Sequence, residues 1–252
     1  KLAVLFDYRD GLPYYFSTHN LQARKTTEVD MVQNLNPGLQ SLFGKKITIG
    51  VWDGGLVRRT HQEFQTNRVS NKSGGQTSNH ATHVMGTILA SGVTDRAKGM
   101  VPQAKAFAYY AFDDDLGPMA QQAAAGLVLS NHSYGLLLGW EFENGDWKWY
   151  GGSTNVDERF GHYSGESKSL DDIAYNAPYY TIVRSAGNDR SDTGDGTRPP
   201  DGAFDCLGPA AVAKNVISVG AITGFDQFGG GGSISMSSFS SWGPTNDGRI
   251  KP

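Results

Sequence analysis

The chain has 252 residues, with 22 Lys and Arg against 25 Asp and Glu, which gives a net charge of −3 with neutral histidines. This near balance argues against a nucleic-acid or anionic-membrane partner, because both require a basic surface. No apolar stretch approaches the roughly 20 residues of a membrane span. A hydrophobic content of 38% and a charged content of 19% suit one globular domain, which we expect to be a monomer.

Residues 1–45 are polar and show no hydrophobic period, so we expect a lead-in arm that ends after a turn at Asn36, Pro37 and Gly38. The first residue is Lys1 and no export signal is recognisable, so we expect that such a signal has been removed. The composition does not change toward Pro252, which predicts that the chain is a segment excised from a longer protein. The single cysteine, Cys206, excludes an internal disulfide.

Strand and helix patterns alternate from residue 46 onward. β-Branched alternation, helical spacing of apolar residues and turn residues predict these elements in order: strand 46–52, helix 80–90 capped by Ser78 or Asn79, strand 104–112, helix 118–126, strand 127–131, helix 170–176, strand 179–184 and strand 215–222. Residues 136–168 have no clear period and predict a loop insertion or hairpin. The order predicts an α/β domain over 46–252, with a doubly wound, mostly parallel sheet covered by helices on both faces.

Polar residues that directly follow strands are the candidates for chemistry, because ligands bind at the carboxyl ends of parallel strands. Asp53, the turn at 131–135 and the segment 185–188 occupy such places, and His80 lies in the first turn of a helix. An aspartate that accepts a hydrogen bond from one ring nitrogen of a histidine fixes the tautomer and leaves the other nitrogen as a base. The amide of Asn188 is a suitable donor to an oxyanion.

Five segments in this order resemble the subtilisin-like serine peptidases: IGVWDGG at 49–55, NHATHVMGT at 79–87, NHSYG at 131–135, SAGN at 185–188 and SFSSWGPTNDGRIKP at 238–252. The amino-acid sequence of these segments is similar to that of a subgroup of secreted bacterial enzymes with long inserted loops. The resemblance implies that Asp53 orients the imidazole, His80 is the general base and Asn188 stabilises the oxyanion. It also implies that Ser133, Tyr134 and Gly135 form a strand edge that binds an extended peptide substrate. Ser185, Ala186 and Gly187 would then line the pocket for the substrate residue before the cut.

The sequence departs from the family at the nucleophile. The family places its serine in a Gly-Thr-Ser-Met stretch, which is absent from this sequence, so we expect the serine to lie beyond the end of this chain and the segment alone to be inactive. The alternative is a catalytically inactive peptide-binding module of the same fold. The resemblance further implies a secreted or cell-surface protein that requires no cofactor, although members often carry structural calcium. Gly54 and Ala81 also differ from the usual family residues, without removing a catalytic atom.

Other interpretations of the same residues stay open. His80 and His83 are three residues apart and could bind a metal, but no HExxH pattern supports this, and His83 is expected to be a hydrogen-bonded core residue. The aspartates at 113–115 and at 189, 192 and 195 are either calcium ligands or solvated loop acids, and their spacing favours the latter. The tryptophans at 140, 147 and 149 are expected to form a small core within the insertion.

Overall fold

The computed structural model describes residues 3–9, 12–17, 20–34, 41–64, 67–225, 227 and 229–252, with the backbone alone for residues 3–17. The turn expected at Asn36, Pro37 and Gly38 lies outside this part of the chain. Within the described ranges, no helix combines the length and the apolar character that crossing a membrane requires.

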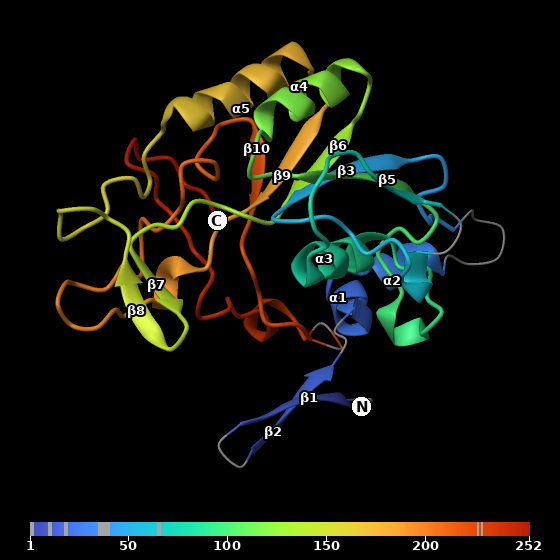
Figure 1. Ribbon diagram of the computed structural model, residues 1–252, viewed down its shortest axis with the longest axis horizontal. Coiled ribbons are helices and arrows are strands. Elements are labelled where there is room, and N and C mark those ends of the chain that lie inside the picture. The colour runs from blue at the N-terminus through green and yellow to red at the C-terminus, as the bar shows by residue number, and fades with distance from the viewer. Residues whose placement is uncertain are drawn as a thin grey trace.

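A six-stranded parallel sheet forms the centre of the molecule (Figure 1). Its spatial order is β10 (Val216–Val219), β9 (Thr181–Ser185), β6 (Leu129–His132), β3 (Thr48–Asp53), β5 (Lys105–Tyr110) and β4 (Val69–Asn71). Neighbouring strands are parallel throughout. The predicted α/β architecture is confirmed, and only the short β4 had no counterpart in the prediction.

Helices cover both faces of this sheet (Figure 1). Helices α4 (Leu116–Ala124) and α5 (Gly165–Asn176) pack on one face through a core that includes Trp52, Met119 and Leu170. Helix α3 (Asn79–Leu89) packs on the other face through Met85 and Leu89. Successive side chains of a strand point to opposite faces, so each strand contributes to both cores.

Two helix starts are fixed by serine caps. The Ser78 hydroxyl accepts a hydrogen bond from the Ala81 amide at 3.3 Å, which confirms the cap predicted for α3. At α5, Ser164 and Ser167 form a reciprocal capping box, and the helix begins at Gly165, earlier than the predicted 170. The first turn of α5 was missed because its residues are polar and carry no apolar period.

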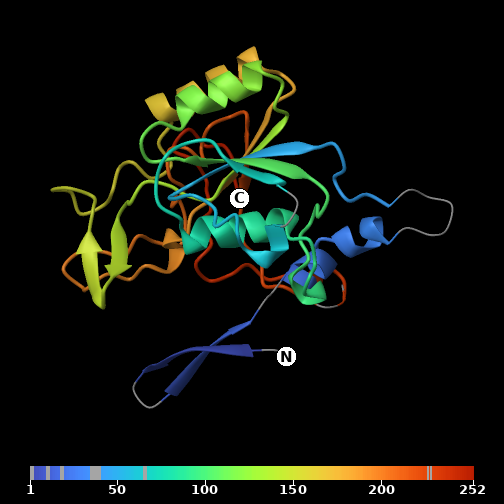
Figure 2. The same ribbon diagram turned by 45° about the vertical axis from the view of Figure 1, so that its right-hand side comes forward.

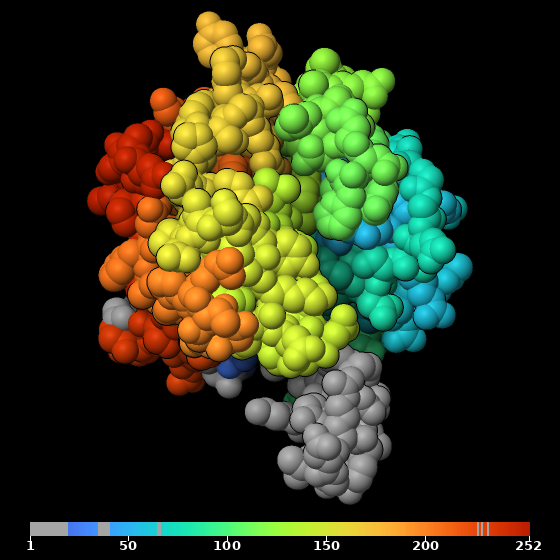
Figure 3. Space-filling model, turned by 60° about the vertical axis from the view of Figure 1, so that its left-hand side comes forward, coloured from blue at the N-terminus to red at the C-terminus, as the bar shows by residue number. Residues whose placement is uncertain are grey.

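The insertion, for which a loop or a hairpin was predicted, contains a hairpin. Strands β7 (Trp140–Glu143) and β8 (Asp146–Trp149) pair antiparallel. The indole of Trp140 is buried against Trp149, with ring centroids 5.3 Å apart, and its N–H donates to the Pro199 carbonyl at 2.9 Å. The hairpin and the segment that contains Pro199 therefore lie side by side, yellow and orange in Figure 3.

The amino-terminal segment is more ordered than predicted. Strands β1 (Ala3–Arg9) and β2 (Leu12–Ser17) form a projecting hairpin, followed by helices α1 (Asn20–Thr26) and α2 (Val29–Gln33) (Figure 2). The buried side chains of Arg24 and Gln33 bond to each other, and the Gln33 amide donates to the Gly99 and Met100 carbonyls. Polar contacts rather than an apolar stripe hold these helices, so the sequence shows no hydrophobic period. The described ranges also contain the short 3-10 helices η1 (Gln62–Phe64), η2 (Asp95–Ala97), η3 (Asp189–Ser191) and η4 (Gly231–Ser233).

Candidate active site

Asp53 and His80 form a hydrogen-bonded pair at the carboxyl end of the sheet. Asp53 is the last residue of β3, and His80 is the second residue of α3. The Nδ1 atom of His80 lies 2.8 Å and 2.9 Å from the two carboxylate oxygens of Asp53. The Gly54 amide also donates to the Asp53 carboxylate, at 2.8 Å. These contacts fix both the direction of the carboxylate and the orientation of the ring.

The two partners of this pair have very different exposure. The Asp53 side chain is 3% exposed, whereas the His80 side chain is 59% exposed. The hydrogen bond to Asp53 raises the pKa of His80, against a smaller lowering by burial. With Nδ1 turned to the carboxylate, Nδ1 carries the proton in the neutral ring and Nε2 has a free lone pair. Among the described residues, Asp53 is the sole hydrogen-bond partner of the His80 ring.

The sheet register aligns Asp53 with the other predicted segments. Trp52 pairs with His132 of β6, and His132 pairs with Arg184 of β9. The next residues along the three strands, Asp53, Ser133 and Ser185, are therefore at the same level. Adjacent strands lie about 4.8 Å apart, so these three positions share one edge.

The segment of Ser133, Tyr134 and Gly135 leaves β6 with free backbone groups. Its three residues have no regular secondary structure, and their backbone amides and carbonyls make no hydrogen bond to a described residue. A further strand could pair there, because an exposed strand edge offers unpaired donors and acceptors.

The segment of Ser185, Ala186, Gly187 and Asn188 faces the previous one. Gly187 has φ +116°, and a Cβ atom there would lie 2.6 Å from a carboxylate oxygen of Asp189, so glycine is required. Asn188 is exposed, and its side-chain amide has no hydrogen bond to a residue of the described part.

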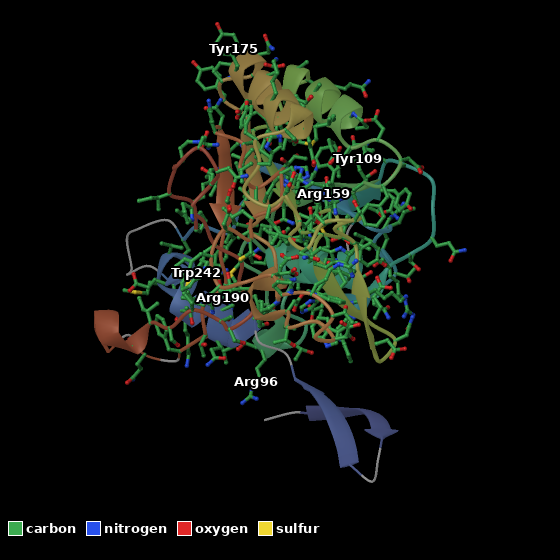
Figure 4. The ribbon with its side chains drawn as sticks, turned by 90° about the vertical axis from the view of Figure 1, so that its left-hand side faces the viewer. Arg96, Tyr109, Arg159, Tyr175, Arg190 and Trp242 are labelled. Atoms are coloured by element: carbon green, nitrogen blue, oxygen red, sulfur yellow. The ribbon has the colours of Figure 1, made fainter. Side chains whose placement is uncertain are left out.

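Contacts with the end of the chain hold the segment that follows Asn188. The Ser241 hydroxyl donates to Asp189 at 2.8 Å, and the Ser241 amide donates to the Gly187 carbonyl at 3.0 Å. The guanidinium of Arg190 lies over the Trp242 ring, 4.1 Å from its centroid (Figure 4). These contacts restrain the backbone that presents Asn188.

One cavity joins the two segments. It has a volume of about 280 Å³ and is lined by all six predicted substrate-binding residues and by Asn188. The insertion contributes Leu136, Leu137, Leu138 and Glu141 to its wall. The structure thus brings the predicted substrate residues together, with Asp53 and His80 on the same sheet edge.

A buried polar network beneath the cavity was not predicted. The Tyr134 hydroxyl donates to the Asp115 carboxylate at 2.5 Å and lies 3.0 Å from Nδ1 of His132. Nε2 of His132 lies 2.8 Å from the Ser130 hydroxyl. Arg184 lies nearby, with 2% of its side chain exposed.

Burial and the positive charge of Arg184 hold the pKa of His132 well below its ordinary value, so this ring is neutral. The sequence identified no partner for His132, and its network is a finding of the structure. The signal in the sequence was its place at an inward-facing strand position, which an unsatisfied polar residue rarely occupies.

The structure also corrects the expectation for His83. His83 is exposed on α3 and has no hydrogen bond within the described ranges, so its assignment to the core was wrong. Its position on the outer face of α3 follows from the helical period, since Ala81 and Met85 take the inner face. No group of three or more His, Cys, Asp or Glu residues in the described chain is arranged to hold a metal ion.

Comparisons with solved structures show the same fold. The prenylagaramide maturation protease PagA superimposes with a TM-score of 0.54 at 19% identity, over 87% of this chain and 64% of that one. The patellamide maturation protease PatA gives 0.52 at 22% identity, over 82% and 64%. The CspB protease of Clostridium perfringens gives 0.60 at 13% identity, over 89% and 78%. The chain thus spans less than two thirds of the length of PagA and PatA.

The sequence itself was compared with curated proteins and with protein families. No curated protein matches it. The model of the subtilase family matches residues 44–252, which include the Asp53–His80 pair, both cavity segments and the whole six-stranded sheet. The chain belongs to the subtilase family of peptidases.

Proposed function

We propose that the protein is a subtilisin-like serine endopeptidase in which Asp53 and His80 are two members of a catalytic triad. The observation that carries the proposal is the 2.8 Å contact between the Asp53 carboxylate and Nδ1 of His80, in a chain of this family. A buried carboxylate holds the ring in one tautomer and stabilises the imidazolium that forms during the reaction. The other nitrogen, Nε2, is then the general base.

The nucleophile is a serine outside these 252 residues. The sequence contains no Gly-Thr-Ser-Met stretch, and the described residues place no hydroxyl on Nε2 of His80. In the reaction, Nε2 takes the proton of that serine while its oxygen attacks the peptide carbonyl, and later returns the proton to the leaving amine. The 252-residue chain then lacks one reacting group and does not hydrolyse peptides alone.

Asn188 stabilises the oxyanion of the tetrahedral intermediate. Its amide is exposed, uncommitted to a described partner, and follows a glycine whose conformation is fixed by its neighbours. An oxyanion donor must be held in place before the reaction, because reorganisation would reduce its benefit. The contacts of Ser241 with Gly187 and Asp189 provide this restraint.

The peptide substrate binds as an extended strand along Ser133, Tyr134 and Gly135. Their free backbone groups support strand addition, which is independent of the substrate sequence. The side chain before the cut enters the cavity between this segment and Ser185, Ala186 and Gly187.

An extracellular or cell-surface location is part of the proposal, as are a monomeric state and catalysis without a cofactor. The location is supported by the family, whose members are often extracellular.

The experiment is a comparison of two histidine variants of the whole protein, assayed on an unstructured protein substrate. His80→Ala is expected to remove cleavage, because no base remains to activate the nucleophile. His83→Ala is the matched control on the same helix, and it is expected to keep activity because its side chain is exposed and has no hydrogen bond to a described residue. A folded wild-type protein that binds peptides and does not cleave them would instead establish the inactive peptide-binding module.

A further inference from the structure

We propose that the cavity selects a carboxamide side chain, glutamine or asparagine, at the substrate residue before the cut. Arg184 is the hydrogen-bond donor at its inner end and Glu166 is the acceptor. The inference rests on the proposed function, since it names the substrate class of the same site. Neither residue belongs to the segments on which the family resemblance was based.

The guanidinium of Arg184 has unused hydrogen-bonding capacity. Its side chain is 2% exposed, and none of its N–H groups makes a hydrogen bond to a residue of the described chain. Its nearest carboxylate oxygens, on Asp115 and Glu166, lie 3.7 Å and 3.9 Å away, which is beyond hydrogen-bond distance. A buried guanidinium with unpaired donors is costly, and an acceptor from the substrate offsets that cost.

Arg184 is placed at the cavity wall, beside Tyr134 and Glu166. Its guanidinium lies over the ring of Tyr134, 4.8 Å from the centroid. Tyr134, Glu166 and Arg184 all line the cavity. Arg184 comes from the end of β9 and Glu166 from the first turn of α5, so two rigid elements hold the pair.

Glu166 provides the complementary acceptor. Its carboxylate lies 3.9 Å from Arg184 and accepts no hydrogen bond from any described residue. A carboxamide carries a carbonyl oxygen and an NH₂ group on one carbon. With its oxygen toward Arg184 and its NH₂ toward Glu166, one amide supplies both missing partners.

The other classes of side chain match this pair less well. The cavity wall carries four carboxyl groups, on Glu141, Glu166, Asp189 and Asp192, against the single guanidinium of Arg184. An acidic side chain is therefore repelled above about pH 7, where Glu141 is ionised as well because burial raises its pKa to about 7. A lysine or arginine can pair with Glu166 but leaves the donors of Arg184 unpaired and adds a like charge beside them. An aliphatic side chain pairs with neither group.

The test is a set of peptides that differ only at the residue before the cut, with Gln, Asn, Leu, Lys or Glu there. For the whole protein we expect kcat/KM to be highest for Gln and Asn, about tenfold or more above Leu and Lys, with Glu lowest. A hydrogen-bonding site usually discriminates at least this strongly against a side chain that lacks the bonds. Higher kcat/KM for Lys, Leu or Glu than for Gln would overturn the inference.

Two variants test whether Arg184 and Glu166 cause the preference for a carboxamide side chain. Glu166→Leu and Arg184→Met are each expected to reduce the ratio of kcat/KM for Gln over Leu to within about threefold of unity. The ratio is taken within one protein, so a loss of folded material does not change it, and Glu166 is partly exposed, which favours folding of its variant. Glu158→Leu is the control, because Glu158 is exposed and does not line this cavity. An unchanged ratio in both test variants would exclude Arg184 and Glu166.

A binding measurement separates this inference from the proposed function. Peptides that end at the varied residue are titrated calorimetrically against the 252-residue chain, which requires no nucleophile. The titration is carried out on the whole protein as well, which cannot cleave a peptide that ends before the cut. Tighter binding of the Gln peptide than of the Leu peptide to the whole protein supports the selective cavity, even if the whole protein cleaves nothing. Equal or weaker binding to the whole protein contradicts it, whether or not cleavage occurs.

Discussion

Two pairs of polar side chains lie near one edge of the sheet, and only one of them is joined by a hydrogen bond. Asp53 and His80 are in hydrogen-bond contact at 2.8 Å, with the ring largely exposed. Arg184 and Glu166 are 3.9 Å apart, with the guanidinium buried and unbonded. The first pair is complete within the protein and presents a free nitrogen for chemistry. The second pair leaves donors and an acceptor for a ligand, which suits recognition rather than proton transfer.

Breaking the first pair should have the largest effect. Asp53→Asn keeps the shape but can no longer stabilise a protonated ring or enforce its tautomer, so kcat of the whole protein is expected to fall by about 10⁴-fold. Steady-state kinetics on a peptide substrate measures this. Asp146→Asn, at the exposed start of β8, is the control and should leave kcat unchanged. A fall of less than tenfold for Asp53→Asn would contradict the role of the pair.

The two pairs were not equally predictable from the sequence. Asp53 and His80 follow a strand and begin a helix, and both lie in segments that resemble a known family. Arg184 lies within a strand, and its neighbours Asp115 and Glu166 come from the starts of two different helices. Only the packing of α4 and α5 on one face of the sheet brings them together, and no local spacing encodes that. The amino-terminal helices were missed for a similar reason, because distant polar contacts hold them.

Asn188 tests whether the segment next to the first pair takes part in the chemistry. Asn188→Ala is expected to reduce kcat by about 10²–10³-fold with little change in peptide affinity, because the oxyanion forms only during the reaction. Pre-steady-state acylation rates separate these two quantities. Asn155→Ala in the exposed insertion loop is the matched control. Turnover within threefold of wild type would withdraw the assignment of Asn188.

The network below the second pair should contribute to stability. Tyr134→Phe removes a hydroxyl that bonds Asp115 and His132, and leaving buried partners unpaired costs about 1–3 kcal/mol in the free energy of unfolding. Urea denaturation measures the change. Tyr175→Phe is the control, since Tyr175 is 82% exposed at the end of α5 (Figure 4). Equal stability of the two variants would show that the network contributes nothing measurable.

His132 should make the protein sensitive to acid. Its pKa in the folded state is well below the ordinary value of about 6.5, so its contribution to stability is complete above that pH and decreases as the pH falls toward the folded pKa. We expect a loss of up to about 1.4 kcal/mol per pH unit below about pH 6.5.

The carboxyl groups of Glu141 and Asp201, whose pKa values burial raises to about 7, titrate in a similar range with the opposite sign. Urea midpoints of the wild type and His132→Gln should therefore be compared at each pH, because these groups are present in both proteins. Parallel pH dependences would refute a buried neutral His132.

Titration of His80 should have the smallest effect on stability, and its pH dependence should be opposite to that of His132. Its pKa is raised by Asp53, so its favourable contribution is present below about pH 6.5 and is lost as the pH rises through the raised pKa. The ring is 59% exposed, and solvent screening keeps the contribution to stability small. NMR titration of the ring protons should give a pKa above about 6.5 that decreases in Asp53→Asn. An identical pKa in both proteins would show that the His80 ring does not interact with the Asp53 carboxylate in solution.

The central claim is that His80 activates a serine. A fluorophosphonate probe reacts with such a serine without requiring the correct substrate, so labelling of the whole protein followed by mass spectrometry tests the claim most directly. We predict one labelled serine beyond residue 252, with labelling lost in His80→Ala and retained in His83→Ala. Absence of labelling in folded wild-type protein, or equal labelling of His80→Ala, would contradict it.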